Sequence, residues 1–165
     1  MKPVKWGIIS TANIGVAKVI PGMLKSKDLE VVAIASRKFK PAREWAGKLG
    51  IPKAYGSYEE MLADPEIEAV YNPLPNHLHV PLTLAAARAG KHVLCEKPIA
   101  ITAKEAQQLR KAPGSVHIAE AFMVRHATQW LAARDLVKKG RIGDVRAIQV
   151  FFSYFNRDPK NVRNK

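Results

Sequence analysis

The 165-residue sequence has a single cysteine, Cys95, and no apolar run of the roughly 18–20 residues that a membrane-spanning helix needs. One thiol excludes an intrachain disulfide and fits a reducing compartment, so we expect a cytoplasmic protein without a membrane partner. The apolar part of Met1–Ile9 is too short for a secretory signal. Cysteines and histidines also lack the spacing of a metal site, and we predict no bound metal.

Acidic side chains are scarce, because 14 Asp and Glu stand against 27 Lys and Arg, which gives a net charge of +13. Such a surplus is compatible with nucleic acid or phosphorylated ligands. The basic residues are scattered, in pairs such as Arg37-Lys38, without a long basic run or an Arg/aromatic stripe. We therefore expect no nucleic-acid partner, and a basic nucleic-acid-binding protein is kept only as the third interpretation.

Short apolar runs alternate with helical patterns through residues 1–119. The runs predict buried strands at 4–9, 29–35, 54–55, 69–71, 92–95 and 116–119. Helices are expected between them, over 13–20, 41–49, 58–63, 76–89 and 102–111. The first should end or kink at Pro21-Gly22, and capping boxes open the third at Ser57 and the fifth at Thr102. Continuously apolar strands separated by helices predict an α/β fold, a doubly wound parallel sheet with helices on both faces.

The pattern changes after residue 119. A helix is expected over Gln129–Lys139 and one long strand over Arg146–Phe155, and these two elements do not make a domain. We therefore predict a complete domain at 1–119 and the incomplete opening of a second α/β domain at 120–165. Because an uncovered strand edge recruits other chains, we expect the isolated chain to self-associate through Arg146–Phe155 or to leave that segment loosely ordered.

The turn after the first strand, Gly7–Gly15, carries small residues where a dinucleotide site has the glycines of G-x-G-x-x-G. Those positions fall on Ser10, Ala12 and Gly15. A pyrophosphate needs a tight turn, close backbone approach and a helix N-terminus aimed at it. The placement directly after a first strand favours such a site over an ordinary strand–helix turn.

The residues after the second strand, Ser36-Arg37-Lys38, bear on the choice of cofactor. An NAD site prefers an acidic residue here to hold the ribose hydroxyls. A hydroxyl and two cations instead suit a 2′-phosphate, although they also suit a solvated loop. If the chain binds a dinucleotide, we therefore predict NADP, with NAD as the alternative.

Two further loops follow strands at the edge where parallel sheets bind ligands. Asn72–His79 is stiffened by two prolines, and its Asn76 is also a good N-cap for the next helix. Cys95-Glu96-Lys97-Pro98 places a lysine that could move a proton in a site of low polarity. Glu96 beside it could orient this lysine or hold it in an ion pair. From these four residues alone, a surface lysine at a strand end is the favoured interpretation of Lys97.

Four segments together resemble the Gfo/Idh/MocA oxidoreductases, the family of glucose–fructose oxidoreductase and inositol dehydrogenase. These segments are Gly7–Gly15, Pro75-Asn76-x-x-His79, Glu96-Lys97-Pro98, and Glu120-Ala121-Phe122 with Arg125. The sequence looks most similar to the dihydrodiol dehydrogenase-like and glucose–fructose oxidoreductase-like branches. The resemblance implies a Rossmann domain that binds NADP or NAD, followed by an α/β domain with a large open sheet through which members commonly pair.

The resemblance also implies the reaction and the residues that serve it. A hydride passes between the nicotinamide and a secondary alcohol or ketone of a sugar, cyclitol or diol, while Lys97 relays the alcohol proton. Arg125 would lie near the substrate pocket. The implied cofactor contacts are Ser10, Ala12, Asn13, Ile14 and Gly15 at the pyrophosphate, Leu74, Pro75, Asn76 and His79 along the inner wall, and Glu96 and Lys97 beside the nicotinamide.

Two departures limit this resemblance. Related sequences often carry an aromatic residue before the arginine and His-Pro shortly after it, where this chain has Val124 and Ala127-Thr128. The family's second catalytic motif, an Asp and a His on a later helix, has no counterpart, so we expect the 165-residue chain alone to show no turnover. The sequence thus indicates the amino-terminal part of an NADP-preferring oxidoreductase, and the second interpretation is a non-catalytic dinucleotide-binding module.

Overall fold

The computed structural model describes residues 2–155 and 157. The chain divides into two compact units, Met1–Phe122 and Met123–Lys165, which are described one at a time. In the described residues, no helix combines the length and the apolar character needed to cross a membrane.

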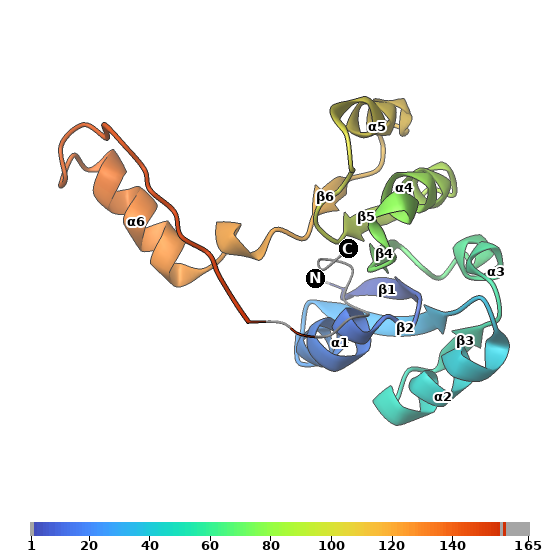
Figure 1. The fold of residues 1–165 in the computed structure, drawn as a ribbon. Helices are drawn as coiled ribbons and strands as arrows, with labels where there is room; N and C mark the ends of the chain where they lie inside the picture. Colours follow the sequence, from blue (N-terminus) through green and yellow to red (C-terminus); the bar gives the residue numbers. More distant parts are fainter. Residues whose placement is uncertain (1, 156, 158–165) are drawn as a thin grey trace. The chain divides into compact units, whose positions relative to one another are not determined.

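The first unit contains one parallel six-stranded sheet in the order β3-β2-β1-β4-β5-β6 (Figure 1). Its strands are β1 (Val4–Ile9), β2 (Leu29–Ala35), β3 (Lys53–Tyr55), β4 (Ala69–Asn72), β5 (His92–Cys95) and β6 (Ile118–Glu120). Ile8 of β1 pairs with Ile34 on one side and Tyr71 on the other. The strand order therefore reverses between β1 and β4, and such a reversal opens a ligand crevice at the carboxyl ends of the strands. This architecture confirms the predicted α/β class.

Helices cover both faces of this sheet. They are α1 (Ile20–Met23), α2 (Phe39–Leu49), α3 (Tyr58–Ala63), α4 (His79–Arg88) and α5 (Ala103–Gln108). Side chains alternate between the faces of a strand, so the neighbours Ile8 and Ile9 enter two different buried clusters. Ser57 and Thr102 are confirmed as N-caps, because Ser57 Oγ accepts from the Glu60 amide at 3.1 Å and Thr102 Oγ1 accepts from the Glu105 amide at 3.2 Å.

The first helix differs from the prediction at Pro21. Gly15–Val19 is π-helical, and α1 then begins at Ile20 with Pro21 in its first turn. A first-turn residue needs no N–H donor, because its amide has no acceptor within the new helix. The π turn therefore ends just before α1 and leaves Pro21 in the first turn of that helix. There its ring does not clash as it would inside a continuous α-helix.

The helix after β4 also begins differently from the expected N-cap at Asn76. A short 3₁₀ turn, η2 (Asn76–Leu78), precedes α4, and Pro75 occupies its N-cap position without a side-chain cap. Asn76 lies inside this turn, so its side chain is not placed to cap the helix. Gly90 follows α4 with φ +76°, the left-handed conformation that its predicted role requires.

The second unit contains a 3₁₀ turn, η4 (Met123–Arg125), and α6 (Thr128–Lys138), which lies close to the predicted helix. The predicted strand over Arg146–Phe155 is wrong, because these residues have no regular secondary structure. Phe151 and Phe152 belong to opposite faces of the predicted strand, yet they are 93% and 85% exposed. An alternating pattern makes a strand only where a neighbouring strand pairs with it, and the described residues pair none with this segment. That residues 120–165 open a second α/β domain remains a prediction.

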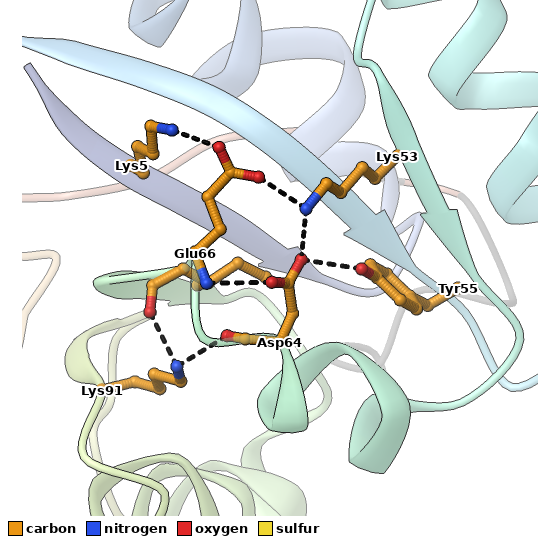
Figure 2. Close-up of polar contacts among 7 residues, drawn as sticks. Lys5, Lys53, Tyr55, Asp64, Glu66 and Lys91 are labelled. Atoms are coloured by element: carbon orange, nitrogen blue, oxygen red, sulfur yellow. Dashed lines mark hydrogen bonds and ion pairs between the residues drawn. The ribbon is translucent and has the colours of Figure 1, made fainter.

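The loop before β4 holds an ion-pair network with side chains of β1 and β3 (Figure 2). Glu66 pairs with Lys5 in β1 and with Lys53 in β3, the latter at 2.6 Å. Lys53 Nζ also lies 2.7 Å from an Asp64 oxygen, and the Tyr55 hydroxyl donates to the same oxygen at 2.7 Å. The Lys53 hydrogen bond lowers the pKa of Asp64 to about 2. We call these five residues the amino-edge network.

Lys91, just before β5, binds beside this network. It is buried, and its Nζ donates to the backbone carbonyls of Asp64 and Ile67 at 2.8 Å each. One ammonium therefore fastens the loop before β4 to the start of β5, far from the carboxyl ends of the strands.

Candidate functional site

The turn after β1 has a conformation that most side chains avoid. Ser10 has φ +85°, a region that favours glycine, and its Oγ accepts a hydrogen bond from the Ala12 amide at 3.2 Å. The first helical bond after the turn runs from the Val16 amide to the Ala12 carbonyl at 3.1 Å. The amides of Asn13, Ile14 and Gly15 therefore precede the first helical hydrogen bond and can donate to an anion.

An open hollow of about 340 Å³ lies at the carboxyl ends of β1, β2 and β4. It brings together six of the residues predicted from sequence to contact the cofactor: Ser10, Ala12, Ser36, Arg37, Leu74 and Pro75. Lys38 lines an adjoining hollow of about 470 Å³ that shares Thr11, Ser36 and Arg37. The turn predicted to hold a pyrophosphate and the residues predicted to hold a 2′-phosphate thus line adjoining hollows.

Three residues in the wall of the first hollow were not predicted from the sequence, namely Tyr58, His77 and Leu78. Tyr58 is the most informative of them, because burial raises the pKa of its hydroxyl while the positive charge of Arg37 opposes that rise. Both residues line the same hollow, although Tyr58 begins α3 and Arg37 lies in the loop after β2. Its position directly after the Ser57 cap was the one available signal, since that cap lies in the loop that follows β3.

Glu96 and Lys97 follow β5 at the same edge of the sheet, but they are not among the residues of these hollows. The Glu96 carboxylate accepts from the Tyr71 hydroxyl at 2.8 Å and from the Lys97 amide at 3.2 Å. Burial, followed by this donation to Glu96, raises the pKa of Tyr71. Lys97 is exposed, and no carboxylate of the described chain lies within ion-pair distance of its ammonium.

His79 has a different place from the one that the resemblance implies. Its side chain is only 1% exposed, and both ring nitrogens lie against backbone carbonyls, Nε2 at 2.6 Å from Leu74 and Nδ1 at 2.7 Å from Pro98. Nearby, the buried Asn72 amide donates to the His79 carbonyl at 3.2 Å, and its oxygen accepts from the Leu74 amide at 3.3 Å. These bonds shape the loop that walls the hollow.

The remaining candidate residues divide between the two units. Asn76 is exposed in the first unit, whereas Arg125 belongs to η4 of the second unit and is described only there. Burial raises the pKa of the Cys95 thiol to about 11, which makes a thiolate role unfavourable. Within residues 2–155 and 157, no three His, Cys, Asp or Glu side chains come together as metal ligands.

A parallel sheet with a strained turn, free helix amides and a cationic hollow at its switch point defines a dinucleotide-binding domain of the Rossmann type. The model of the oxidoreductase family described as having an NAD-binding Rossmann fold matches residues 4–129. The chain therefore belongs to the Gfo/Idh/MocA oxidoreductase family. This confirms the family resemblance and the prediction of a nicotinamide dinucleotide as cofactor.

Similar proteins include an uncharacterised oxidoreductase of Rhizobium meliloti, 55% identical over 99% of this chain and 50% of the relative. The NADP-dependent D-xylose 1-dehydrogenase 2 of Haloferax volcanii is 44% identical over 90% of this chain and 46% of its own length. Among solved structures, the 3-ketoreductase KijD10 of Actinomadura kijaniata, in complex with NADP and TDP-benzene, matches with a TM-score of 0.80. It is 33% identical and covers 88% of this chain and 45% of KijD10. The chain spans about half the length of the curated relatives that it matches.

Proposed function

We propose that this chain is the cofactor-binding part of an NADP-preferring oxidoreductase that acts on a secondary alcohol or ketone of a sugar, cyclitol or diol. The observation that carries the proposal is the single hollow that joins the strained Ser10 turn to Ser36 and Arg37. The NADP in the KijD10 complex and in the name of the Haloferax relative supports this choice of cofactor.

The described residues suit such a cofactor by chemistry as well as by place. The amides of Asn13, Ile14 and Gly15 offer donors to the pyrophosphate. Ser36 and Arg37 offer a hydroxyl and a planar cation to a 2′-phosphate, with Lys38 adding charge from the adjoining hollow. Leu74 and Pro75 provide an apolar wall on the other side. No acidic side chain stands at residues 36–38, where an NAD site would hold the ribose hydroxyls.

The reacting end would lie beside Glu96 and Lys97. Bound nicotinamide supplies the hydride acceptor or donor. As the neutral amine, Lys97 accepts the hydroxyl proton at Nζ when the alcohol is oxidised, and as the ammonium it gives a proton to the ketone oxygen when the ketone is reduced. Its exposed side chain, without a carboxylate partner in the described residues, is free to do so. Glu96 keeps its carboxylate turned to Tyr71 and the Lys97 amide, and therefore does not neutralise the ammonium.

The proposal also covers the substrate, the oligomeric state and the location of the whole protein. A small polyol, sugar or diol is the substrate class, and Arg125 is a substrate contact of the whole enzyme. The names of two relatives, a D-xylose dehydrogenase and a 1,5-anhydro-D-fructose reductase, support sugar chemistry. We also infer a cytoplasmic homo-oligomer that pairs through the second-domain sheet and binds neither nucleic acid nor membrane.

The cofactor assignment is tested by titrating NADPH and NADH into the wild-type chain and Arg37→Ala. The variant should weaken NADPH by about 1–3 kcal/mol, the worth of a charge-assisted contact, and leave NADH almost unchanged. Arg43→Ala, on the exposed side of α2, is the matched control and should change neither affinity. Equal losses for both cofactors in Arg37→Ala would contradict the assignment of the 2′-phosphate.

A further inference from the structure

The segment that carries Lys97 is held by side chains from outside its own loop. On one side, His79 of α4 contacts the Pro98 carbonyl through Nδ1 at 2.7 Å. On the other, the Ile99 amide donates to Glu120, at the end of β6, at 2.8 Å. Two consecutive backbone groups just after Lys97 are thereby tied to two different elements of the fold.

His79 also reaches in the opposite direction. Its Nε2 lies 2.6 Å from the carbonyl of Leu74, a residue of the hollow that we assign to the adenosine half of the cofactor. A neutral imidazole donates through one nitrogen, whereas the imidazolium donates through both and satisfies both carbonyls. With hydrogen on both ring nitrogens, the ring joins the wall of the hollow to the Lys97 loop by two hydrogen bonds. Being 1% exposed, it connects them from inside the protein.

We propose that His79 and Glu120 are positioning residues, a clamp that sets Lys97 against the nicotinamide half of the cofactor and links it to the adenosine hollow. This inference rests on the proposed function. The lysine side chain is long and has several rotatable bonds, so on a loop whose backbone also moves it has no single preferred position. Fixing the backbone at residues 98 and 99 leaves only the side chain of Lys97 to be ordered when the cofactor binds.

The clamp makes a prediction that differs from that of a residue needed only for folding. 2′,5′-ADP carries the adenosine and 2′-phosphate groups but lacks the nicotinamide, so it should use the hollow without using Lys97. The ratio of NADP affinity to 2′,5′-ADP affinity therefore reports the nicotinamide half alone. Glu120→Ala should lower this ratio about three- to tenfold, the effect of losing one hydrogen bond, at unchanged 2′,5′-ADP affinity.

The variants are chosen for what each leaves in place. Glu120 is exposed, so its replacement does not open the core, and Glu120→Gln keeps an oxygen acceptor for the Ile99 amide and should restore the ratio. Glu105→Ala is the matched control, because Glu105 accepts from the Ile101 amide at 2.9 Å, a similar bond farther from Lys97. His79→Gln tests the other side of the clamp and should lower the ratio too.

A second readout follows Lys97 directly, as its rate of acylation by acetic anhydride measured by mass spectrometry. In the wild type, NADP should protect Lys97 more than 2′,5′-ADP does, and Glu120→Ala should remove most of that difference. An unchanged ratio in Glu120→Ala, an equal loss for both ligands, or a wild-type ratio near one would overturn the clamp. Failure of the wild type to bind 2′,5′-ADP at all would instead overturn the proposed function, and the clamp with it.

Discussion

The two ends of the parallel sheet use their cations in opposite ways. At the amino-terminal end, Lys5 and Lys53 are paired with carboxylates, and Lys91 is buried against two carbonyls. At the carboxyl-terminal end, Arg37 and Lys97 are exposed and have no ion pair to a described carboxylate. The same residue types thus complete the fold at one end and are left for a ligand at the other.

This contrast separates stability from function within one small domain. Changes at the amino-edge network should alter the free energy of unfolding and leave cofactor affinity alone. Changes to Arg37 and Lys97 at the carboxyl-terminal end should alter binding or turnover with little cost in stability, because few internal contacts depend on those two side chains. A variant of the amino-edge network that changed cofactor affinity, or a variant of Arg37 or Lys97 that changed the free energy of unfolding, would contradict this separation.

The largest expected effect is on turnover. In a chain extended by a complete second domain, Lys97→Met should reduce turnover about 10²- to 10⁴-fold, as loss of an acid/base group does, while NADPH still binds. Steady-state rates and a cofactor titration on the same samples measure both quantities. Lys104→Met, an exposed lysine of α5, should turn over like the wild type. Wild-type rates in Lys97→Met would make Lys97 an ordinary surface lysine.

At the opposite end, Asp64→Asn should destabilise the fold by about 1–3 kcal/mol, because it removes the charged acceptor of Lys53 and Tyr55. The lowered pKa of Asp64 means that its stabilisation is present above the ordinary carboxyl value of 3.8 and is lost as the pH falls toward about 2. Urea unfolding at neutral pH and near pH 3 should therefore show a smaller acid loss in the variant.

The matched control for that experiment is Asp28→Asn, an exposed carboxylate in the turn before β2. It should leave both the urea midpoint and its acid dependence as in the wild type. Reduced NADPH affinity in folded Asp64→Asn would show that the two ends of the sheet are coupled after all.

A smaller effect is expected at the strained turn. Ser10→Gly should raise the free energy of unfolding by about 0.5–1 kcal/mol, because glycine adopts φ +85° without the strain that serine bears. Ser26→Gly is a close control, since Ser26 Oγ accepts from the Asp28 amide at 3.2 Å as Ser10 Oγ does from Ala12, without a positive φ. Denaturant titrations compare the two, and a loss of stability in Ser10→Gly would contradict the account of strain.

Local patterns predicted most of the first unit. Buried strands such as Leu29–Ala35 are apolar throughout, and a capping residue such as Ser57 acts on an amide three positions away, so both signals are contained in a few residues. The passage of the helix through Pro21 was missed, because a π turn leaves no mark that distinguishes it from a helix end. Arg146–Phe155 was wrongly predicted as a strand because alternation says nothing of a pairing partner.

Only those residues of the site that directly follow a strand could be predicted from the sequence. Ser10, Ser36 and Arg37 follow their strands directly, and parallel topology gathers such positions at one edge. Tyr58 could not be assigned to the hollow, because its place in the wall depends on how the start of α3 packs against the loop after β2. The pairing of Lys5 with Glu66 spans 61 positions and likewise has no local signal.

The most direct test follows backbone amides by NMR as NADPH is added to this 18.3 kDa chain. The account predicts shifts concentrated at residues 10–15 and 36–38, with the amides of Lys5, Lys53 and Glu66 unmoved. Shifts concentrated at Lys5, Lys53 and Glu66, or no shifts at high NADPH concentration, would contradict the claim that the cations at the carboxyl ends of the strands bind a phosphorylated dinucleotide.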